Sequence, residues 1–231
     1  MTVIFFTRFS IPIPENSQGV PFKTAREHRY NDYLNILFSY ERLKTKMCYF
    51  KNLCLPSILN QTSKNWKWYI FTCHKLPSNI LIELKSLIRP HSAIELHFVE
   101  NLDEFKSLST GILSKRKEKY INCRIDDDDG LEKTFVKKML QYINLPTSTI
   151  VNFTEAIKTS YDTESDEIFF HDSVQINHNS IGLGAVNSPI HKFGNHNRIH
   201  EKNSILYDRT PGMVFQTCDQ WCDTKRKVFY S

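Results

Sequence analysis

The sequence of 231 residues lacks the features that define several protein classes. No two of its six cysteines form a Cys-x-x-Cys pair, so we interpret them as reduced thiols and not as a disulfide framework. No apolar stretch approaches the ~20 residues needed to cross a bilayer. The apolar start, Met1 to Phe9, has neither the basic region nor the small-residue cleavage site of a signal peptide. We therefore expect a cytoplasmic protein.

Strong charge of one sign is also missing. The chain has 30 basic and 25 acidic residues, which gives a net charge of +5. The densest basic spots are Lys115–Lys117 and Lys225–Lys227, and neither has the interleaved aromatic residues typical of a nucleic-acid-binding face. We expect no nucleic-acid partner. The mild positive excess fits an anionic substrate, and it also fits peripheral association with an anionic membrane surface.

The first 145 residues alternate between predicted strands and predicted helices. Apolar and β-branched segments predict strands, and apolar side chains at three- and four-residue spacing predict helices. The predicted strands are Thr2–Phe6, Trp66–Thr72, Ile94–Val99 and Tyr120–Ile125. The predicted helices lie between Ala25 and Phe38, from Ser39 to about Asn60 with a kink at Pro56, and at Ile80–Ile88, Leu102–Ser114 and Leu131–Ile143. This alternation is typical of an α/β fold with a mostly parallel sheet.

The pattern changes after Pro146. Two further strands are predicted without a clear helix between them, at Thr149–Phe153 and Glu167–His171. Ile181–Val186 contains two glycines and predicts a flexible segment, and residues 188–211 predict a long loop. Loops of that length in a compact domain often bind ligands. No linker separates the two parts, so we expect one domain over residues 1–231.

Four consecutive aspartates, Asp126–Asp129, follow the fourth predicted strand and precede Gly130. Neighbouring carboxylates about 6 Å apart repel each other by about 1–3 kcal/mol per pair at effective dielectric constants of 20 to 80, so we expect something to neutralise the run. Mg²⁺ or Mn²⁺ is a natural candidate, because proteins hold these ions with one or two carboxylates and substrate phosphates. The alternative is a solvated loop in which Asp129 caps the following helix. Ligand sites of α/β proteins lie at the carboxyl ends of strands, which favours the ligand site.

Four short motifs, in this order, resemble a known family. They are Thr7-Arg8-Phe9-Ser10, Glu41-Arg42-Leu43, Cys54-Leu55-Pro56-Ser57 and Arg124-Ile125-Asp126-Asp127-Asp128-Asp129. The segment from Leu55 to Thr62 resembles the end of the first helix of GT-A glycosyltransferases, and the acidic run resembles their DxD motif. The set resembles a bacterial family of putative rhamnosyltransferases, over roughly residues 1–190.

The resemblance implies a GT-A fold of the nucleotide-diphospho-sugar transferase type, with a mostly parallel twisted sheet flanked by helices. It implies metal-dependent transfer of a hexose or deoxyhexose, such as rhamnose, from a nucleoside-diphosphate donor to a glycan, polysaccharide or lipid-linked acceptor. Residues 1–145 would bind the nucleotide sugar, and residues 146–231 would bind the acceptor. Such an enzyme would work in the cytoplasm, at or near the inner face of the membrane.

The resemblance also implies roles for the acidic run. In GT-A enzymes the DxD carboxylates hold Mn²⁺ or Mg²⁺, and the metal neutralises charge on the leaving diphosphate. Asp126 and Asp128 are the spaced pair, with Asp126 toward the ribose or a metal-bound water and Asp128 on the metal. Asp127 and Asp129 are the alternative register, because a slip of one residue exchanges the two faces of a strand.

Basic side chains are the expected partners of the donor. Arg8 and Arg124 lie near the ends of predicted strands, where they can meet the diphosphate or the base, since guanidinium groups bind phosphate oxygens well. Arg42, near the start of a predicted helix, is a further candidate. Alternatively, these are ordinary surface arginines.

The second half of the chain is expected to supply the remaining site residues. An inverting transferase needs an Asp or Glu as general base for the acceptor hydroxyl, and Asp208 and Asp219 are favoured for this role over Asp172. GT-A enzymes often add a histidine to the metal ligands, and we favour His196 over its neighbours His191 and His200.

Two other functions stay open at this point. A sugar nucleotidyltransferase shares the α/β frame and the need for a metal, but such enzymes usually have a glycine-rich loop after the first strand, and Thr7 to Pro14 contains no glycine. A degenerate transferase that binds a nucleotide or glycan without turnover is the alternative from a different class.

Overall fold

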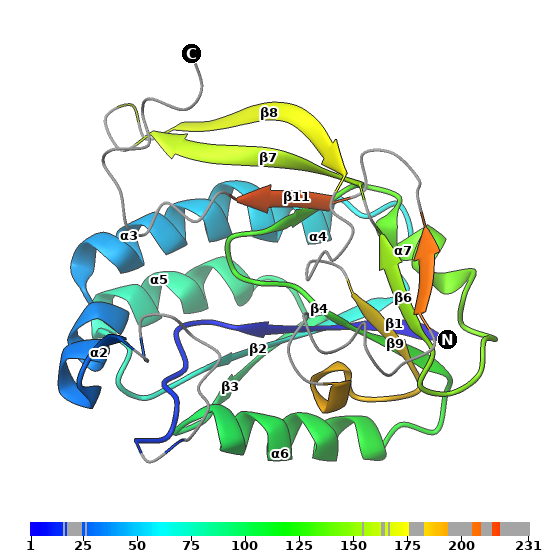
Figure 1. Ribbon diagram of the computed structural model, residues 1–231, viewed down its shortest axis with the longest axis horizontal. Helices are drawn as coiled ribbons and strands as arrows, with labels where there is room; N and C mark the ends of the chain where they lie inside the picture. The colour runs from blue at the N-terminus through cyan, green and yellow to red at the C-terminus, as the bar shows by residue number, and fades with distance from the viewer. Residues whose placement is uncertain are drawn as a thin grey trace.

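The structure is a computed structural model that describes residues 1–15, 17, 25, 27–153, 155–162, 165, 167–175, 183–193, 205–208 and 214–217. Within these residues, seven strands form a central sheet (Figure 1). Their order across the sheet is β10 (Ile205–Asp208), β6 (Ile150–Phe153), β9 (Gly184–Val186), β4 (Tyr120–Arg124), β1 (Thr2–Arg8), β2 (Trp66–Thr72) and β3 (Ile94–Phe98). Neighbouring strands are parallel except at β9, which runs antiparallel to β4 and β6.

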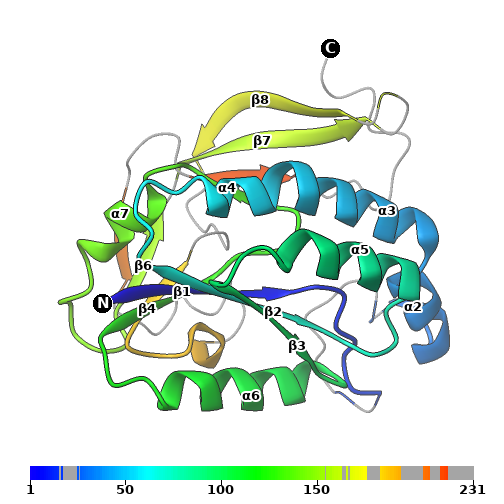
Figure 2. The same ribbon diagram turned by 180° about the vertical axis from the view of Figure 1, so that it is seen from behind.

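Helices cover both faces of this sheet (Figures 1 and 2). One face carries α6 (Leu102–Ser114), and the other carries α3 (Tyr40–Tyr49), α4 (Leu55–Leu59), α5 (Ser78–Ile88) and α7 (Phe135–Leu140). Successive side chains of a strand point to opposite faces. Accordingly, Val3 and Phe5 of β1 belong to the core beneath α3 to α5, and Ile4 and Phe6 belong to the core above α6. The uninterrupted apolar sequence of β1 therefore suits a strand buried on both sides.

A smaller sheet forms an outer layer over α3 and α4 (Figure 1). In the described residues it has the strand order β5 (Gly130–Leu131), β11 (Val214–Thr217), β7 (Glu155–Asp162) and β8 (Glu167–Gln175). Tyr161 of β7 packs against Tyr49 of α3, with 5.7 Å between the ring centroids. Because β4 precedes the acidic run and β5 follows it, the four aspartates span the gap between the two sheets.

Most predicted elements of the first half are confirmed. The strands β1 to β4 and the helix α6 lie where the sequence places them, and α2 (Tyr30–Leu37) lies within the predicted range Ala25–Phe38. The helix that begins after Ser39 runs through α3, a π-helical turn η1 (Phe50–Cys54) and α4. The predicted kink at Pro56 is therefore this wider turn, which ends just before Pro56. Pro56 itself lies in the first turn of α4.

Three predictions were wrong. The helix expected at Leu131–Ile143 is confined to α7, because Gly130 and Leu131 pair with β11 as a strand. The flexible segment expected at Ile181–Val186 contains β9, which is buried between β4 and β6. The loop expected over residues 188–211 contains a 3₁₀ turn η2 (Ile190–Phe193) and the strand β10. In each case pairing with distant residues decides the local structure.

Within the described residues, every helix is too short or too polar to cross a membrane. The proposed division into a donor half and an acceptor half stays a prediction.

Gly184 is a position where the packing of the sheet requires glycine. A Cβ atom there would lie 2.8 Å from Ile121 Cγ2 and 2.8 Å from Met139 Sδ. We expect Gly184→Ala to lower the free energy of unfolding by about 1–3 kcal/mol, because overpacking forces neighbours to shift. Urea denaturation measures this change.

The matched control is Gly111→Ala in α6, where a Cβ would meet nothing within 4 Å. Alanine favours a helix over glycine by up to about 1 kcal/mol, so this variant should be as stable as the parent or more so. Equal effects of the two substitutions would contradict the packing argument.

Candidate functional site

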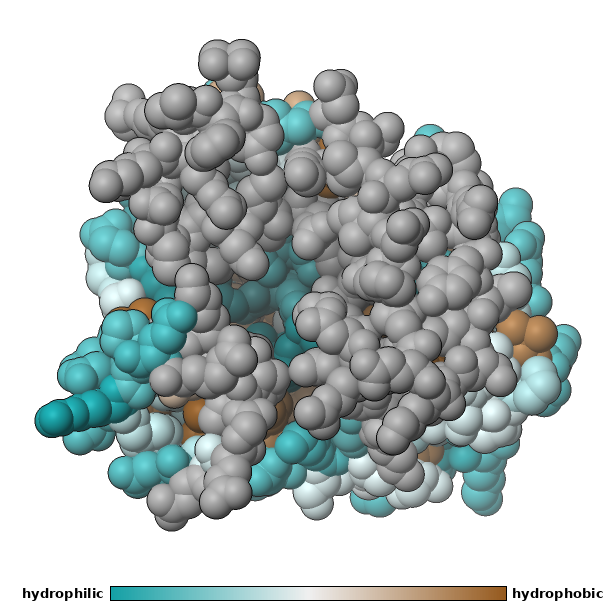
Figure 3. Space-filling view, in the orientation of Figure 1, coloured by the Kyte–Doolittle hydropathy of each residue, from teal (hydrophilic) through white to brown (hydrophobic). Residues whose placement is uncertain are grey.

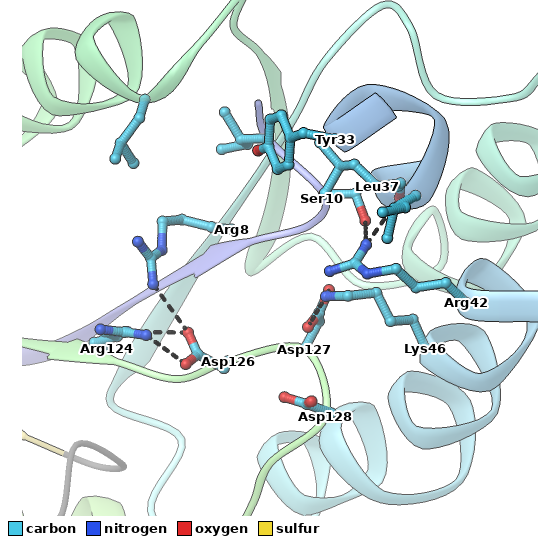
Figure 4. A pocket seen from close by; sticks show the side chains of 13 residues that line it. Arg8, Ser10, Tyr33, Leu37, Arg42, Lys46, Arg124, Asp126, Asp127 and Asp128 are labelled. Carbon is cyan, nitrogen blue, oxygen red and sulfur yellow. Dashed lines mark hydrogen bonds and ion pairs between the residues drawn. The ribbon is translucent and has the colours of Figure 1, made fainter. Parts of the chain in front are cut away.

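A pocket of about 180 Å³ opens beside the carboxyl ends of β1 and β4 (Figure 4). One part of its wall is apolar and is formed by Ile11, Tyr33, Ile36, Leu37 and Leu102. The other part is polar and charged, and it is formed by Arg8, Ser10, Arg42, Lys46, Arg124, Asp126, Asp127 and Asp128. Hydrophilic side chains also line a hollow near the middle of the face drawn in Figure 1 (Figure 3). Three of the four sequence motifs thus contribute side chains to one pocket at the expected end of the sheet.

Asp126 is neutralised by two arginines. Arg124 Nε lies 3.0 Å from Asp126 Oδ1 and Arg124 Nη2 lies 2.5 Å from Oδ2, while Arg8 Nη2 is 3.6 Å from Oδ1. Both arginines lie on one face of the sheet, because Phe6 pairs with Arg124 and Arg8 follows two residues later. Burial alone would raise the pKa of Asp126, but Arg124 and Arg8 outweigh burial and hold this pKa well below its usual range.

Arg8 stays a cation in this setting. Burial, and after it the charge of Arg124, lower the pKa of Arg8 to about 10, which is still well above neutral pH. The ends of β1 and β4 therefore present two adjacent positive charges against one carboxylate.

Asp127 is neutralised by a residue that the sequence did not single out. Lys46 of α3 hydrogen-bonds both oxygens of the Asp127 carboxylate through its Nζ atom. Only 7% of the Lys46 side chain and 2% of the Asp127 side chain are exposed. This buried ion pair joins residues 81 positions apart, so no local pattern could reveal it.

Asp128 faces the pocket and forms no ion pair with any residue that the structure describes. Its pKa is raised to about 7, first by burial and then by the neighbouring charge of Asp127. A raised carboxylate pKa means that the local environment does not supply enough positive charge. Among the three carboxylates of the run that line the pocket, Asp128 is therefore the one with the most to gain from an added cation.

Asp129 is not among the residues that line the pocket. It is buried, its backbone N–H donates to the carbonyl oxygen of Asp126 at 3.2 Å, and this bond closes the turn. Burial, followed by the charge of Asp128, raises the pKa of Asp129 well above its usual value. Asp129 therefore belongs to the support of the turn and does not line the pocket.

Gln61 links the segment from Leu55 to Thr62 to the chain beside the acidic run. Its buried side chain donates from Nε2 to the carbonyl oxygens of Ser57 at 2.9 Å and Glu132 at 2.8 Å, and its Oε1 accepts from the N–H of Val136 at 2.9 Å. The two hydrogen bonds to Glu132 and Val136 fasten the end of α4 to the chain just after the run. They fix the direction in which the backbone leaves the four aspartates.

Arg42 and Ser10 form the opposite side of the pocket (Figure 4). Arg42 Nη1 donates to Ser10 Oγ at 3.2 Å and to the carbonyl oxygen of Leu37 at 2.9 Å. Ser10 has a φ of 52°, in the left-handed region that side chains other than glycine seldom adopt. Such strained residues cluster at functional sites.

A family model described as "Putative rhamnosyl transferase" matches residues 2–230. The chain belongs to this family. Its fold resembles that of TarS 1-349 from S. aureus, with 10% identity and a TM-score of 0.51 over 94% of this chain and 60% of that one. The family resemblance and the α/β fold of the GT-A type expected from the sequence are thus confirmed.

Two further structures are similar over most of the chain. TarS 1-349 in complex with UDP is 9% identical, with a TM-score of 0.48 over 94% of this chain and 61% of that one. A putative nucleotide-diphospho-sugar transferase from Desulfovibrio desulfuricans G20 is 11% identical, with a TM-score of 0.40 over 95% of this chain and 83% of that one. This family member thus spans about 60% of the length of the S. aureus fragment. A comparison with curated protein sequences gives no match.

For three other predicted site residues of this rhamnosyl transferase family member, Asp208, Asp219 and His196, the structure describes no side chain. Asp208 lies in β10, on whose side chains the structure gives no information. Asp219 and His196 lie outside the described residues. His191 is directed to α6, where its ring nitrogens lie 3.3 Å from Ser109 Oγ and 3.0 Å from Thr110 Oγ1. Within the part of the chain that the structure describes, no group of three or more His, Cys, Asp or Glu side chains is arranged to hold a metal ion.

The raised pKa of Asp128 predicts a pH-dependent stability. Between about pH 4 and pH 7 the folded protein keeps a proton that the unfolded chain has lost, so this residue lowers the free energy of unfolding as the pH rises. Asparagine carries no charge. We therefore expect the melting temperature of Asp128→Asn, relative to the parent, to rise by roughly 2–8 °C from about pH 5 to about pH 8.

Calorimetry in the presence of a metal chelator measures this difference. The control is Asp103→Asn on α6, a side chain that is 65% exposed. A stability difference for Asp128→Asn that does not change with pH would show that Asp128 is charged and well solvated in the folded protein.

Proposed function

We propose that this protein is a metal-dependent glycosyltransferase of the hexosyltransferase class, which moves a sugar from a nucleoside-diphosphate donor to a glycan or polysaccharide acceptor. One observation carries the proposal. Three arginines and one open carboxylate meet at a single pocket, and an apolar wall completes it. The family to which the chain belongs suggests rhamnose as the sugar. The proposed setting is the cytoplasm, at or near the inner face of the membrane.

The arginines suit the diphosphate of the donor. Arg8 and Arg124 already hold a carboxylate, and guanidinium groups recognise phosphate oxygens with the same geometry. Arg42 lies across the pocket from them (Figure 4). In the proposed reaction the anomeric carbon exchanges its bond to the diphosphate oxygen for a bond to the acceptor oxygen, and negative charge develops on the leaving diphosphate. Fixed positive charges aimed at that group lower the barrier.

The carboxylate of Asp128 suits a divalent cation. Mn²⁺ or Mg²⁺ is commonly bound through one or two carboxylates plus substrate phosphates, and Asp128 offers one open carboxylate beside the arginines. The raised pKa of Asp128 supports this assignment, because an added cation would relieve the deficit of positive charge. When bound, the metal would act as a Lewis acid on the diphosphate. His196 is proposed as a further ligand.

The apolar wall suits the nucleoside. Tyr33, Leu37 and Leu102 line the pocket beside the charged groups. Small-molecule sites typically combine such an apolar surface with a few polar groups that fix orientation. For the acceptor hydroxyl, a carboxylate is proposed as general base, with Asp208 and Asp219 as candidates.

Calorimetry with UDP, GDP, dTDP and CMP, with and without Mn²⁺, tests the proposal. We expect one nucleoside diphosphate to bind in the presence of Mn²⁺ and to lose at least about 100-fold in affinity in Asp128→Asn, because this change removes the carboxylate ligand, and the loss of a residue that only supports a ligand already costs about 10–100-fold. Asp103→Asn is the matched control and should bind like the parent.

Release of the same nucleoside diphosphate from its sugar conjugate in the presence of acceptor would establish transfer. Binding without any turnover would favour a non-catalytic relative. If no nucleotide binds with or without metal, the proposed function is wrong.

A further inference from the structure

The ion pair between Lys46 and Asp127 has no role in the function proposed so far. Lys46 comes from α3, its Nζ atom hydrogen-bonds both carboxylate oxygens of Asp127, and both side chains are almost fully buried. The same carboxylate lies between Asp126, which the arginines hold, and Asp128, which faces the pocket. The pair therefore acts at the centre of the acidic run.

Stability is a poor explanation for this pair. Two charges lose much hydration when they are buried, and replacing a buried ion pair with apolar side chains often leaves stability unchanged or improves it. Where such pairs are useful, they specify one arrangement among several. Here the alternative arrangement is specific, because Asp127 lines the pocket beside Asp128, and without Lys46 its carboxylate could meet the same cation.

The helical segment that carries Lys46 approaches the acidic run with several of its residues. Arg42 lies one turn before Lys46 and lines the pocket, and Cys54 lies two turns after it, with Sγ 3.5 Å from the carbonyl oxygen of Asp126. In an α-helix four residues turn through about 40° more than one full turn, so residues spaced four apart do not stay on one side of the helix. The wider π-helical turn η1 turns less per residue, and this returns Cys54 to the side of the helix that carries Arg42 and Lys46.

Lys46 itself is held in place by aromatic packing. Its Nζ atom lies 5.6 Å from the centroid of the Phe9 ring, and Phe9 packs edge-on against Phe50 of η1 at 5.8 Å. Phe9 and Phe50 are both fully buried. These contacts hold the ammonium group of Lys46 in position beside Asp127.

We propose that Lys46 is a positioning residue for the transfer reaction. By binding Asp127 it removes that carboxylate from the possible metal ligands, and it fixes the turn so that Asp128 faces the pocket. This inference rests on the proposed function for its catalytic meaning. Its structural part, the fixing of the acidic run, stands independently of what the pocket binds.

The test compares three variants of the ion pair with one surface control. Lys46→Met removes the charge and leaves Asp127 buried without a partner, so it is expected to be unstable. The double variant Lys46→Met/Asp127→Asn removes both charges and should fold. Lys46→Arg keeps a cation for Asp127, and Lys106→Met on α6, where the lysine is 47% exposed, is the surface control.

Two readouts separate positioning from mere support of the fold. The first is hydrogen–deuterium exchange of a peptide covering residues 125–134, which should be faster in the double variant and unchanged in Lys46→Arg and Lys106→Met. The second is the Mn²⁺-dependent affinity for the nucleoside diphosphate that the parent binds. We expect a loss of about 10–100-fold in the double variant, as is common when the support of a metal ligand is removed, and rescue by Lys46→Arg.

Each outcome decides the inference. Parent-like exchange in the double variant would overturn it, even if the parent is a transferase. Faster exchange with unchanged Mn²⁺-dependent affinity would overturn the link to the reaction. If the parent binds no nucleotide, the proposed function fails, and exchange alone decides whether Lys46 fixes the run.

Discussion

The repulsion among four adjacent carboxylates is the constraint on which this site depends. A buried turn cannot hold four negative charges unless cations meet them or protons stay bound. The protein uses both means. Arg124 and Arg8 meet Asp126, Lys46 meets Asp127, and the pKa values of Asp128 and Asp129 are raised. Asp126 and Asp127 are thus paired with cations, Asp129 is buried and does not line the pocket, and Asp128 lines the pocket without an ion pair to a described residue.

The fold supplies these cations from three separate elements. Parallel pairing of β1 with β4 brings the two strand ends together, so Arg8 lies beside Arg124. The helix α3 packs on the face of the sheet opposite α6, and it brings Lys46 and Arg42 to the pocket from the other side. Gln61 then fastens the exit of the run to α4. An elementary electrostatic requirement therefore links the sheet, the helix layer and the motif at Leu55–Thr62.

The sequence was informative where a signal is local. Apolar strands, the spacing of apolar side chains in α6, and an acidic run at a strand end all follow from neighbouring residues. Lys46 was missed because a lysine in a helix is usually solvated, and its partner is 81 residues away. The strand β5 was missed for the same reason, since its partner β11 is more than 80 residues further along the chain. The resemblance identified Arg8, Arg124 and the acidic run as candidate site residues. Only the packing of the folded chain shows that Asp127 is paired with Lys46 and Asp128 is not.

The most direct measurement is a crystal structure of the protein with Mn²⁺ and the nucleoside diphosphate that it binds, with the metal located by its anomalous scattering. The account predicts Mn²⁺ on the carboxylate of Asp128 at about 2.0–2.3 Å, the diphosphate against Arg8 and Arg124, and Asp127 still paired with Lys46. Mn²⁺ coordinated by Asp127, with Lys46 displaced, would contradict it.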